Sequence, residues 1–473
     1  MQKLKPIRVL LAAFLCLPAF AQAQTITLDE FLAQLKQKYP LFEKERLAIQ
    51  VEEEERTGLL GAEDWYIFSS VNLSHEEPAI AFSGPERTNA FLMSGGAERV
   101  FWKTGGRLSA SFSSGFARIK IDPLFGVPNS FYQNQIAVVY AHPLLKNKRG
   151  FLDRLEYDLK QFDVDFSEVQ AIENQENFLA EVAGKFLDWV FYSEQKRIVA
   201  ERIALAEGEL ARAQRKREAN LIDQVDVIRA ADAVRIARQN QVLVESQWKG
   251  LQAELAVLSG NQELYASNPA FNLYDFLEIG AFEEAADHLK KNSRLIQTLN
   301  VRLNQLEFAR KGFEETLKPD LSLVARLNTK RLDEGLGKSW LMNKPDLIVG
   351  VHLSVPLENR TANSQIAKAD LQAAQLAKQS EELALTLTSA LANLHIQIQE
   401  FEKALKLNIE QIASAQEKTQ EELKLYNQGR GDLTFVIQSQ DNEETAKLTY
   451  AGNALTYHKL ILEYRALMDQ LHE

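Results

Sequence analysis

The stretch LIVGVHLSVPLENR, residues 347–360, joins a predicted strand to a very long predicted helix. Every second residue from Leu347 to Leu357 is apolar, whereas positions 350, 352 and 354 hold Gly, His and Ser. This alternation is typical of a β-strand with one apolar and one polar face. Pro356 cannot take part in a sheet ladder, so the strand ends there. About 65 residues of helical character follow.

The N-terminal segment 1–23 has the features of a secretory signal peptide. Lys3, Lys5 and Arg8 precede an apolar run from Val9 to Phe20, and Ala21-Gln22-Ala23 fits a cleavage site. We therefore expect cleavage after Ala23, with Gln24 as the first residue of the mature chain. The apolar run is too short to span a bilayer as a helix.

Charge and cysteine content restrict the possible functions. The formal charge is −11, and removal of the three basic residues of the signal peptide changes it to −14, which argues against nucleic acid as a partner. The single cysteine, Cys16, lies in the signal peptide, so neither disulfides nor cysteine-ligated metals are predicted for the mature chain. No later segment has 18 consecutive apolar residues, so any contact with a membrane must use strands.

The chain contains an internal duplication. The strand-to-helix segment at 347 has a counterpart, NQIAVVYAHPLLKNKRG, at 134, and GRGDLTFVIQS at 429 has a counterpart, NLIDQVDVIRA, at 220. The two pairs are offset by 213 and 209 positions, which indicates a repeat of roughly 210 residues. We predict a first repeat at 24–260, a linker at 261–280 and a second repeat at 281–473.

Each repeat is predicted to contain the same order of elements. A shorter helical stretch (27–62; 281–316) precedes strands (about 64–142; 320–357), then a helix of about 70 residues and one of about 40 (148–260; 361–471). The long helix would measure about 100 Å at 1.5 Å per residue. Apolar residues spaced three and four apart predict coiled-coil packing for it: Leu387, Leu391, Leu394, Ile398, Phe401, Leu405, Ile409 and Ile412.

The strand candidates each have one apolar and one Ser/Asn-rich face. This pattern fits membrane-barrel strands, and it also fits a half-buried sheet of a soluble protein; the signal peptide favours the barrel. Between 76 and 133 the glycine pairs 95–96 and 105–106 indicate loops, and a possible hairpin near 99–116 has no clear place in the plan. The candidate lipid-facing residues are Trp65, Ile67, Val71, Leu347, Val349, Val351 and Leu353.

A duplicated strand–long helix–short helix unit behind a signal peptide resembles the outer-membrane efflux protein family, the TolC-like channels. The two strand-to-helix joints carry the likeness, together with the helix breaks NLIDQVDVIRA and YNQGRGDLTFVIQSQ, which are similar to the family's turn motif. The resemblance covers essentially the whole chain after residue 26. It rests on the order, duplication and spacing of the four stretches.

The resemblance implies a mainly α fold with a membrane β-barrel. Family members are homotrimers in which each chain gives four strands to a twelve-stranded barrel, continued by a coiled-coil α-barrel. The expected location is the cell outer membrane and periplasm, in contact with outer-membrane lipid. The expected partners are a periplasmic adaptor and an inner-membrane transporter, and the expected function is a passive exit duct in drug efflux or type I secretion. The sequence does not identify the cargo.

The resemblance also implies a periplasmic gate at the two helix breaks. Asp226 matches the family's tip aspartate, with Asp223 one turn before it, and Tyr426 and Arg430 lie at or beside family positions. Two further aspartates of the family are Phe435 and Gln438 here, so Asp432 is the remaining acidic candidate, although it also occupies a helix N-cap position. Tyr426 and Arg430 are the donors available to hold the aspartates.

Other classes of function have less support. The seven histidines form no metal-binding pair, and neither a P-loop, a nucleophile elbow nor a dinucleotide-binding motif occurs, so we predict no catalytic residue, metal site or cofactor. The main alternative is a periplasmic coiled-coil adaptor or scaffold protein of an export complex. Such adaptors have one helical hairpin and an anchor, whereas this sequence predicts two hairpins.

Overall fold

The computed structural model describes residues 24–78, 84–121, 126 and 128–471. The predicted signal peptide and its cleavage site at Ala23 lie outside these residues. Contacts divide the described chain into two compact units. The sheet unit comprises 43–175 and 283–390, and the tip unit comprises the remaining described residues. Within the described part of the chain, no helix has the length and apolar character needed to cross a bilayer.

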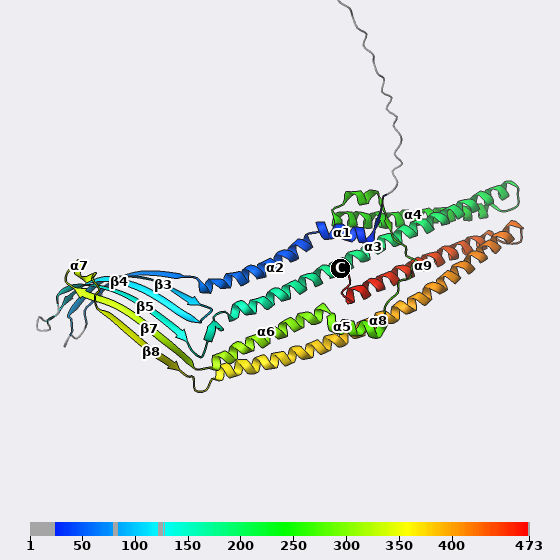
Figure 1. Cartoon of the computed structure of the whole chain (residues 1–473). Coiled ribbons are helices and arrows are strands. Elements are labelled where there is room, and N and C mark those ends of the chain that lie inside the picture. The colour runs from blue at the N-terminus through cyan, green and yellow to red at the C-terminus, as the bar shows by residue number, and fades with distance from the viewer. Residues whose placement is uncertain (1–23, 79–83, 122–125, 127, 472–473) are drawn as a thin grey trace, which may run out of the picture. The chain divides into compact units, whose positions relative to one another are not determined.

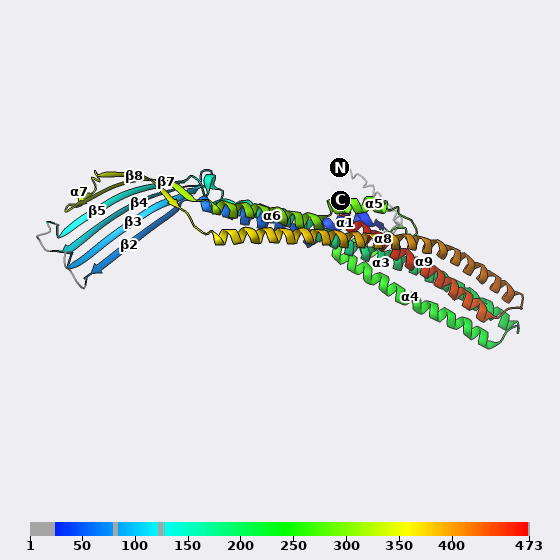
Figure 2. The ribbon, with the colours of Figure 1, turned by 90° about the horizontal axis from the view of Figure 1, so that it is seen from below.

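The sheet unit contains one antiparallel sheet of six strands (Figures 1 and 2). In chain order and in spatial order they are β2 (Tyr66–Glu76), β3 (Arg87–Phe101), β4 (Gly106–Lys120), β5 (Ser130–Pro143), β7 (Asp320–Asp333) and β8 (Pro345–Ser354). Neighbouring strands in the sheet are therefore also neighbours along the sequence, although β5 and β7 come from opposite halves of the chain. β2 and β8 are the two edges.

The expectation of four strands per chain was wrong for this sheet. The hairpin near 99–116 is formed by β3 and β4, which pair along 15 residues each around a turn at 102–105. The Gly95-Gly96 pair, interpreted above as a loop, lies inside β3. A Cβ on Gly96 would come within 2.6 Å of the Phe68 ring, so the glycine makes room for an aromatic side chain on the next strand.

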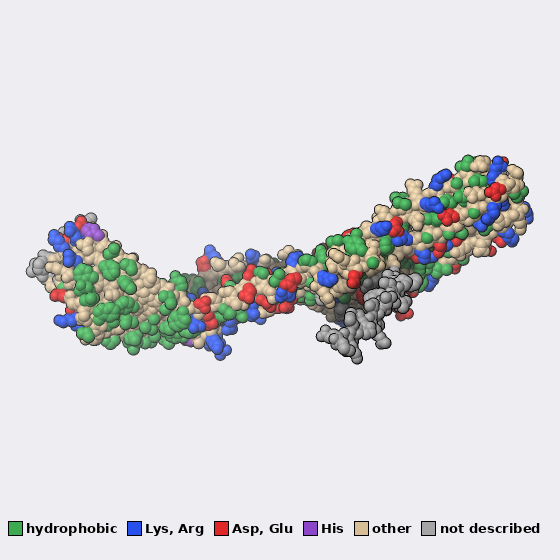
Figure 3. All heavy atoms as spheres, turned by 90° about the horizontal axis from the view of Figure 1, so that it is seen from above, with side chains coloured by type: hydrophobic (Ala, Val, Ile, Leu, Met, Phe, Trp, Pro, Cys, Tyr) green, Lys and Arg blue, Asp and Glu red, His purple; other side chains and the backbone are tan. Residues whose placement is uncertain are grey.

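The register shows that one face of the sheet is apolar across all six strands. Residues directly opposite each other in an antiparallel pair share a face, and the pairing links a single row: Ile67, Ala97, Ala110, Val138, Leu327 and Leu347. Figure 3 shows hydrophobic side chains gathered over the strands. On the opposite face, one row across five of the strands is polar: Ser70, Ser94, Ser113, Gln135 and Lys330.

Of the predicted lipid-facing residues, those within β2 and β8 lie on this apolar face. Val71 is opposite Met93 in β3, and Val349, Val351 and Leu353 alternate along β8 with side chains that are about 60 % exposed. Trp65 precedes β2, and its ring lies 5.8 Å from the Arg99 guanidinium. The structure therefore places these residues at the two opposite edges of the sheet, while their contact with lipid stays a prediction.

Helices lead into and out of the strands. In the sheet unit α2 (Pro40–Gly58) and the 3-10 helix η1 (Leu59–Glu63) precede β2, and α5 (Phe282–Asn292) and α6 (Arg294–Leu317) precede β7. The 3-10 turn η3 (Lys148–Gly150) follows β5, and the short α7 (Leu336–Ser339) lies between β7 and β8. The stretch 27–62 is thus helical as predicted, with a break at Tyr39.

Two long helices follow the sheet strands in the sequence. They are α3 (Leu155–Glu218) of 64 residues and α8 (Arg360–Asn427) of 68 residues, so the second is about 100 Å long. Shorter helices follow, α4 (Gln224–Ser259) and α9 (Leu433–Leu467). Of the predicted coiled-coil positions in α8, Leu391 and Ile398 are fully buried, whereas Ile409 is 48 % exposed. The breaks at 219–223 and 428–432 agree with those predicted.

The tip unit has a small region of its own around the predicted linker. β1 (Gln24–Thr27) pairs in parallel with β6 (Ser267–Ala270), which follows the 3-10 helix η4 (Gln262–Ala266). Thr27 and Glu30 form a capping box that starts α1 (Leu28–Lys38), and Gly260 ends α4 in the left-handed conformation. The compact units draw on both sequence repeats, so the repeat boundaries stay a prediction.

Candidate functional site

The candidate site lies at the two helix breaks of the tip unit, where α3 turns into α4 and α8 turns into α9. Both long helices end in the same way. After α3, Asn220 has a φ of 53°, and the Leu221 amide donates back to the Lys216 carbonyl oxygen. After α8, Gly429 has a φ of 72°, and the Arg430 amide donates back to the Leu425 carbonyl oxygen. Asn and Gly are the residues that most readily adopt this left-handed conformation at a helix end. The two breaks are therefore sharp, defined turns.

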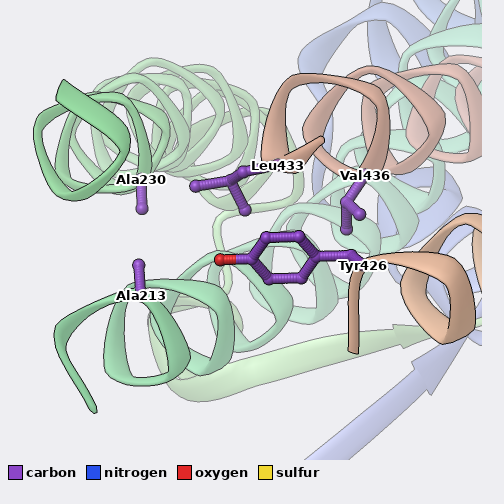
Figure 4. Packing of buried hydrophobic residues seen from close by; sticks show 5 residues of the cluster. All are labelled: Ala213, Ala230, Tyr426, Leu433 and Val436. Atoms are coloured by element: carbon purple, nitrogen blue, oxygen red, sulfur yellow. The ribbon is translucent and has the colours of Figure 1, made fainter. Parts of the chain in front are cut away.

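The four helices meet in a small apolar cluster, called the tip cluster here. It consists of Ala213 from α3, Ala230 from α4, Tyr426 from α8, and Leu433 and Val436 from α9 (Figure 4). Because two of the five side chains are methyl groups, the helices leave space for the Tyr426 ring between them. The first and second halves of the sequence are joined at the tip by this packing.

Tyr426 is the largest side chain of the tip cluster, and it is 3 % exposed. Its hydroxyl is buried and has no hydrogen-bond partner in the described residues. The Lys216 ammonium lies 3.4 Å from the ring centroid and donates to the Tyr426 carbonyl oxygen at 2.6 Å. Burial raises the pKa of Tyr426 and lowers the pKa of Lys216. Within one chain, Tyr426 therefore does not donate to the tip aspartates.

The acidic candidates have different local roles. Asp432 is the N-cap of α9 and accepts from the Thr434 amide at 2.7 Å, which confirms the capping role and lowers the pKa of Asp432. Asp226 pairs with Arg229 at 3.1 Å on its own helix. Asp223 occupies the N-cap position of α4, but its side chain makes no capping bond. Arg430 forms no ion pair within the described residues.

The sequence analysis missed a buried polar stripe on α3. Arg202 is 4 % exposed, and its guanidinium donates to Asp441 at 2.7 Å and to Gln440 at 3.2 Å on α9. The Gln440 amide donates to Glu209 at 3.1 Å, and Glu209 also pairs with Arg212. Buried charges require such partners, so the stripe fixes how α3 and α9 align.

A regular spacing in the sequence could have revealed this stripe. Arg202, Glu209 and Lys216 are seven residues apart, so they occupy the same position in successive heptads. All three contact the second half of the chain, at Asp441, Gln440 and the Tyr426 carbonyl respectively. Counting only apolar heptad positions overlooks such a row, because its members are charged.

A groove of about 370 Å³ lies between α4 and α9, beside the tip cluster. Arg229 and Asp232 of α4 and Gln438 and Asp441 of α9 line it, together with the apolar Ile236. Gln438 occupies a position where the TolC-like family has an aspartate, so this groove is less acidic than the resemblance implies.

Comparison with known proteins gives a clear result for structure and none for sequence. No protein-family model and no curated protein matches the chain. Among solved structures, the outer-membrane channel OprN aligns with a TM-score of 0.67 at 13 % identity, over 94 % of this chain and 90 % of that one. The outer membrane protein VceC of Vibrio cholerae aligns at 0.64 and 9 % identity, over 94 % and 96 %.

A third solved structure, CusC, was studied for its folding and transmembrane channel formation. It aligns with a TM-score of 0.68 at 10 % identity, over 93 % of this chain and 91 % of that one. Such likeness extends over nearly the whole described chain. At identities this low it concerns the fold, and the chain has the fold of these outer-membrane channel proteins.

Proposed function

We propose that this protein is an outer-membrane channel that gives exported molecules a passive path across the outer membrane and periplasm. The observation that carries the proposal is the sheet: one face is apolar along a row that crosses all six strands, and the other is polar. A membrane barrel needs such a sheet, with its apolar face toward lipid and its polar face toward a water-filled lumen. The shared fold with solved channels supports the same function.

The channel is a homotrimer in this proposal. Among the described residues, no strand pairs with the outer side of β2 or of β8, and most residues of these two edge strands are exposed. Open sheet edges are not tolerated in lipid, so further copies must pair with them. The resemblance implies three copies in a twelve-stranded barrel. We keep the trimer in this proposal. Because each chain has six strands and not four, the number of strands in the barrel is considered separately below.

The helices form the periplasmic part, and the tip is the end that meets other proteins. A periplasmic adaptor is the proposed partner, and it connects the channel to an inner-membrane transporter. Arg229, Asp232 and Gln438, which line the groove between α4 and α9, offer polar contacts for such a partner. The channel itself performs no chemistry. The cargo, a small molecule or a secreted protein, is selected by the transporter.

Native mass spectrometry and planar bilayers together test this proposal. The protein extracted from outer membranes should have three times the mass of one chain and should conduct ions across a lipid bilayer. A monomer without conductance would instead favour the adaptor or scaffold alternative, because an adaptor binds a channel and forms no pore. The same preparation shows the mature N-terminus, which is expected at Gln24.

A further inference from the structure

The β3–β4 hairpin gives this chain two more strands than the four that the resemblance implies. We propose that both strands lie in the barrel wall, so that three chains close a barrel of eighteen strands with a correspondingly wider lumen. This inference rests on the proposed trimeric channel. Beyond that function, it specifies the width of the pore and hence the size of the solutes that can pass.

The first argument is that the hairpin is a full member of the sheet. Every residue of β2 from Tyr66 to Glu76 has a partner in β3, and β4 pairs with β5 from Arg107 to Arg118. Without β3 and β4, the sheet within one chain would lose the connection between β2 and β5. The hairpin thus lies between the other strands, and it is not an appendage at an edge.

The second argument is that the hairpin continues both faces of the sheet. Ala97 and Ala110 extend the apolar row between Ile67 and Val138, and Phe91 is opposite Phe116 on the same face. On the other face, Ser94 and Ser113 continue the row that begins at Ser70, with a hydroxyl contact of 2.7 Å between Ser70 and Ser94. If the hairpin instead folded into the lumen as a plug, it would not need an apolar face in register with the barrel wall.

The third argument is that the hairpin turn is fixed to the strand-to-helix joint. The Trp102 amide donates to the Glu63 carboxylate at 2.8 Å, and the indole ring, which is 8 % exposed, lies 5.5 Å from the Tyr157 ring. Gly150 faces the turn so closely that a Cβ there would meet the Trp102 carbonyl oxygen. The turn therefore packs at the same end of the sheet where β5 gives way to α3.

The fourth argument concerns ring closure. The strands alternate in direction, so in a sheet of six the edges β2 and β8 run in opposite directions. When β8 of one copy pairs with β2 of the next, the pair is again antiparallel. Six strands per chain therefore close into a ring as readily as four, with the apolar face kept on one side throughout.

The consequence is a wider pore. With strands about 4.8 Å apart and tilted by about 40°, eighteen strands enclose a cylinder about 35 Å across between backbones, and twelve strands one of about 24 Å. Barrels of 16–18 strands leave an open aqueous channel. The polar face contributes Ser111, Arg326 and Lys330 among others, so the lumen suits hydrated solutes. We expect it to pass hydrated polymers that a twelve-stranded lumen excludes.

Cysteine accessibility tests where the hairpin lies. The expected mature chain contains no cysteine, so single cysteines are placed at Ala110 and Ser111, which are neighbours on β4 with opposite faces. Leu327→Cys and Asn328→Cys on β7 are matched controls, since they lie in the same two rows of the sheet. A charged, membrane-impermeant thiol reagent is applied to the reconstituted trimer. We expect Ser111→Cys and Asn328→Cys to react and to lose conductance, and Ala110→Cys and Leu327→Cys to stay unmodified.

Two results separate this inference from the proposed function. If the β7 pair alternates but Ala110→Cys and Ser111→Cys react equally, the channel exists and the hairpin lies outside its wall. If no variant and no wild-type trimer conducts, the channel function itself is wrong. Polyethylene glycols of graded size give an independent measure on the unmodified protein when they are added only on the side where the barrel opens, because there they enter the barrel before the narrower proposed entrance at the helix tips. Eighteen strands predict a cut-off diameter about 12 Å larger than twelve strands at the level of the sheet, and a twelve-strand cut-off overturns the inference.

Discussion

At the scale of single residues, Tyr426 shows how a predicted functional side chain can have a structural role. The sequence position suggested a hydrogen-bond donor to the tip aspartates. In the structure its ring fills the space left by Ala213 and Ala230, and its hydroxyl is buried without a partner in the described residues. A buried hydroxyl without a hydrogen bond costs stability, so the structure favours a packing role for the ring over a donor role for the hydroxyl.

Tyr426→Phe distinguishes these two roles. If the hydroxyl has no partner in the trimer, its removal should leave the melting temperature of the protein unchanged or raise it, since up to about 1–3 kcal/mol of desolvation cost is relieved. Tyr426→Ala is the control for the ring, and it should cost about 3–5 kcal/mol, as large-to-small changes in a core do. A destabilised Tyr426→Phe trimer, measured by thermal unfolding, would mean that the hydroxyl does form a hydrogen bond in the assembled protein.

Gly150 is a second residue whose backbone conformation determines its identity. Its φ is 65°, and a Cβ would overlap the Trp102 carbonyl oxygen. We expect Gly150→Ala to destabilise the sheet by more than the roughly 1–2 kcal/mol that a left-handed conformation costs an L-residue, because the clash adds to it. Gly184→Ala, in α3 with open space around it, should instead stabilise by about 0.5–1 kcal/mol. Urea unfolding of both variants tests the contrast, and equal effects would contradict it.

At the scale of elements, the strands provide the sharpest prediction. Val71 and Ser70 are neighbours on the edge strand β2 and point to opposite faces. Val71→Asp should strongly reduce the yield of trimer in the membrane, since a charge on the lipid face of a barrel costs up to about 2–4 kcal/mol for basic residues and somewhat less for acidic ones. Ser70→Asp should assemble normally, because its face meets water. Quantification of the heat-modifiable trimer by gel electrophoresis gives the comparison, and equal losses would mean that the sheet is not a barrel wall.

The elements also show how much of the fold was predictable. The alternation in β7 and β8 and the long helical runs around them are strong periodic patterns, so these elements occur close to where the sequence places them. The hairpin near 99–116 was expected from the sequence, but its place in the sheet was not, because two Gly-Gly pairs resemble turns. Only one of them, at 105–106, marks the turn, and the other lies beneath Phe68 inside a strand. The periodicity of a single segment can identify a strand. It cannot show that Gly96 lies in a strand interior because a ring from the neighbouring strand, Phe68, covers it.

The candidate site was predictable to a smaller extent. The positions of both helix breaks and the capping role of Asp432 follow from local sequence, and the structure confirms them. The seven-residue spacing of Arg202, Glu209 and Lys216 is visible in the sequence, but their partners lie more than 200 residues away, and local sequence does not identify them. The stripe and the tip cluster both join α3 of the first half to helices of the second half, so the two halves are coupled where the gate is proposed.

At the scale of the whole molecule, the question is what keeps a trimeric entrance closed. Three copies would bring three Asp226 and three Asp223 side chains near one axis, and like charges in a narrow aqueous neck repel. Asp226 already has Arg229 as a partner, whereas Arg430 has no ion pair within the described residues. Arg430 is therefore the group that we expect to hold an acidic side chain of the neighbouring chain.

The gate can be tested by conductance in planar bilayers. A partly exposed ion pair contributes about 0–1 kcal/mol, so Arg430→Ser should raise the open fraction of the channel by up to about fivefold. Lys424→Ser is the matched control, because it removes the same charge from an exposed residue that pairs with Glu421 on its own helix. Asp226→Asn should weaken the cation selectivity that an acidic neck produces. If Arg430→Ser and Lys424→Ser behave alike and Asp226→Asn leaves selectivity unchanged, the closed state is held elsewhere. The Tyr426 packing would then be the next place to look, since it joins all four helices at the entrance.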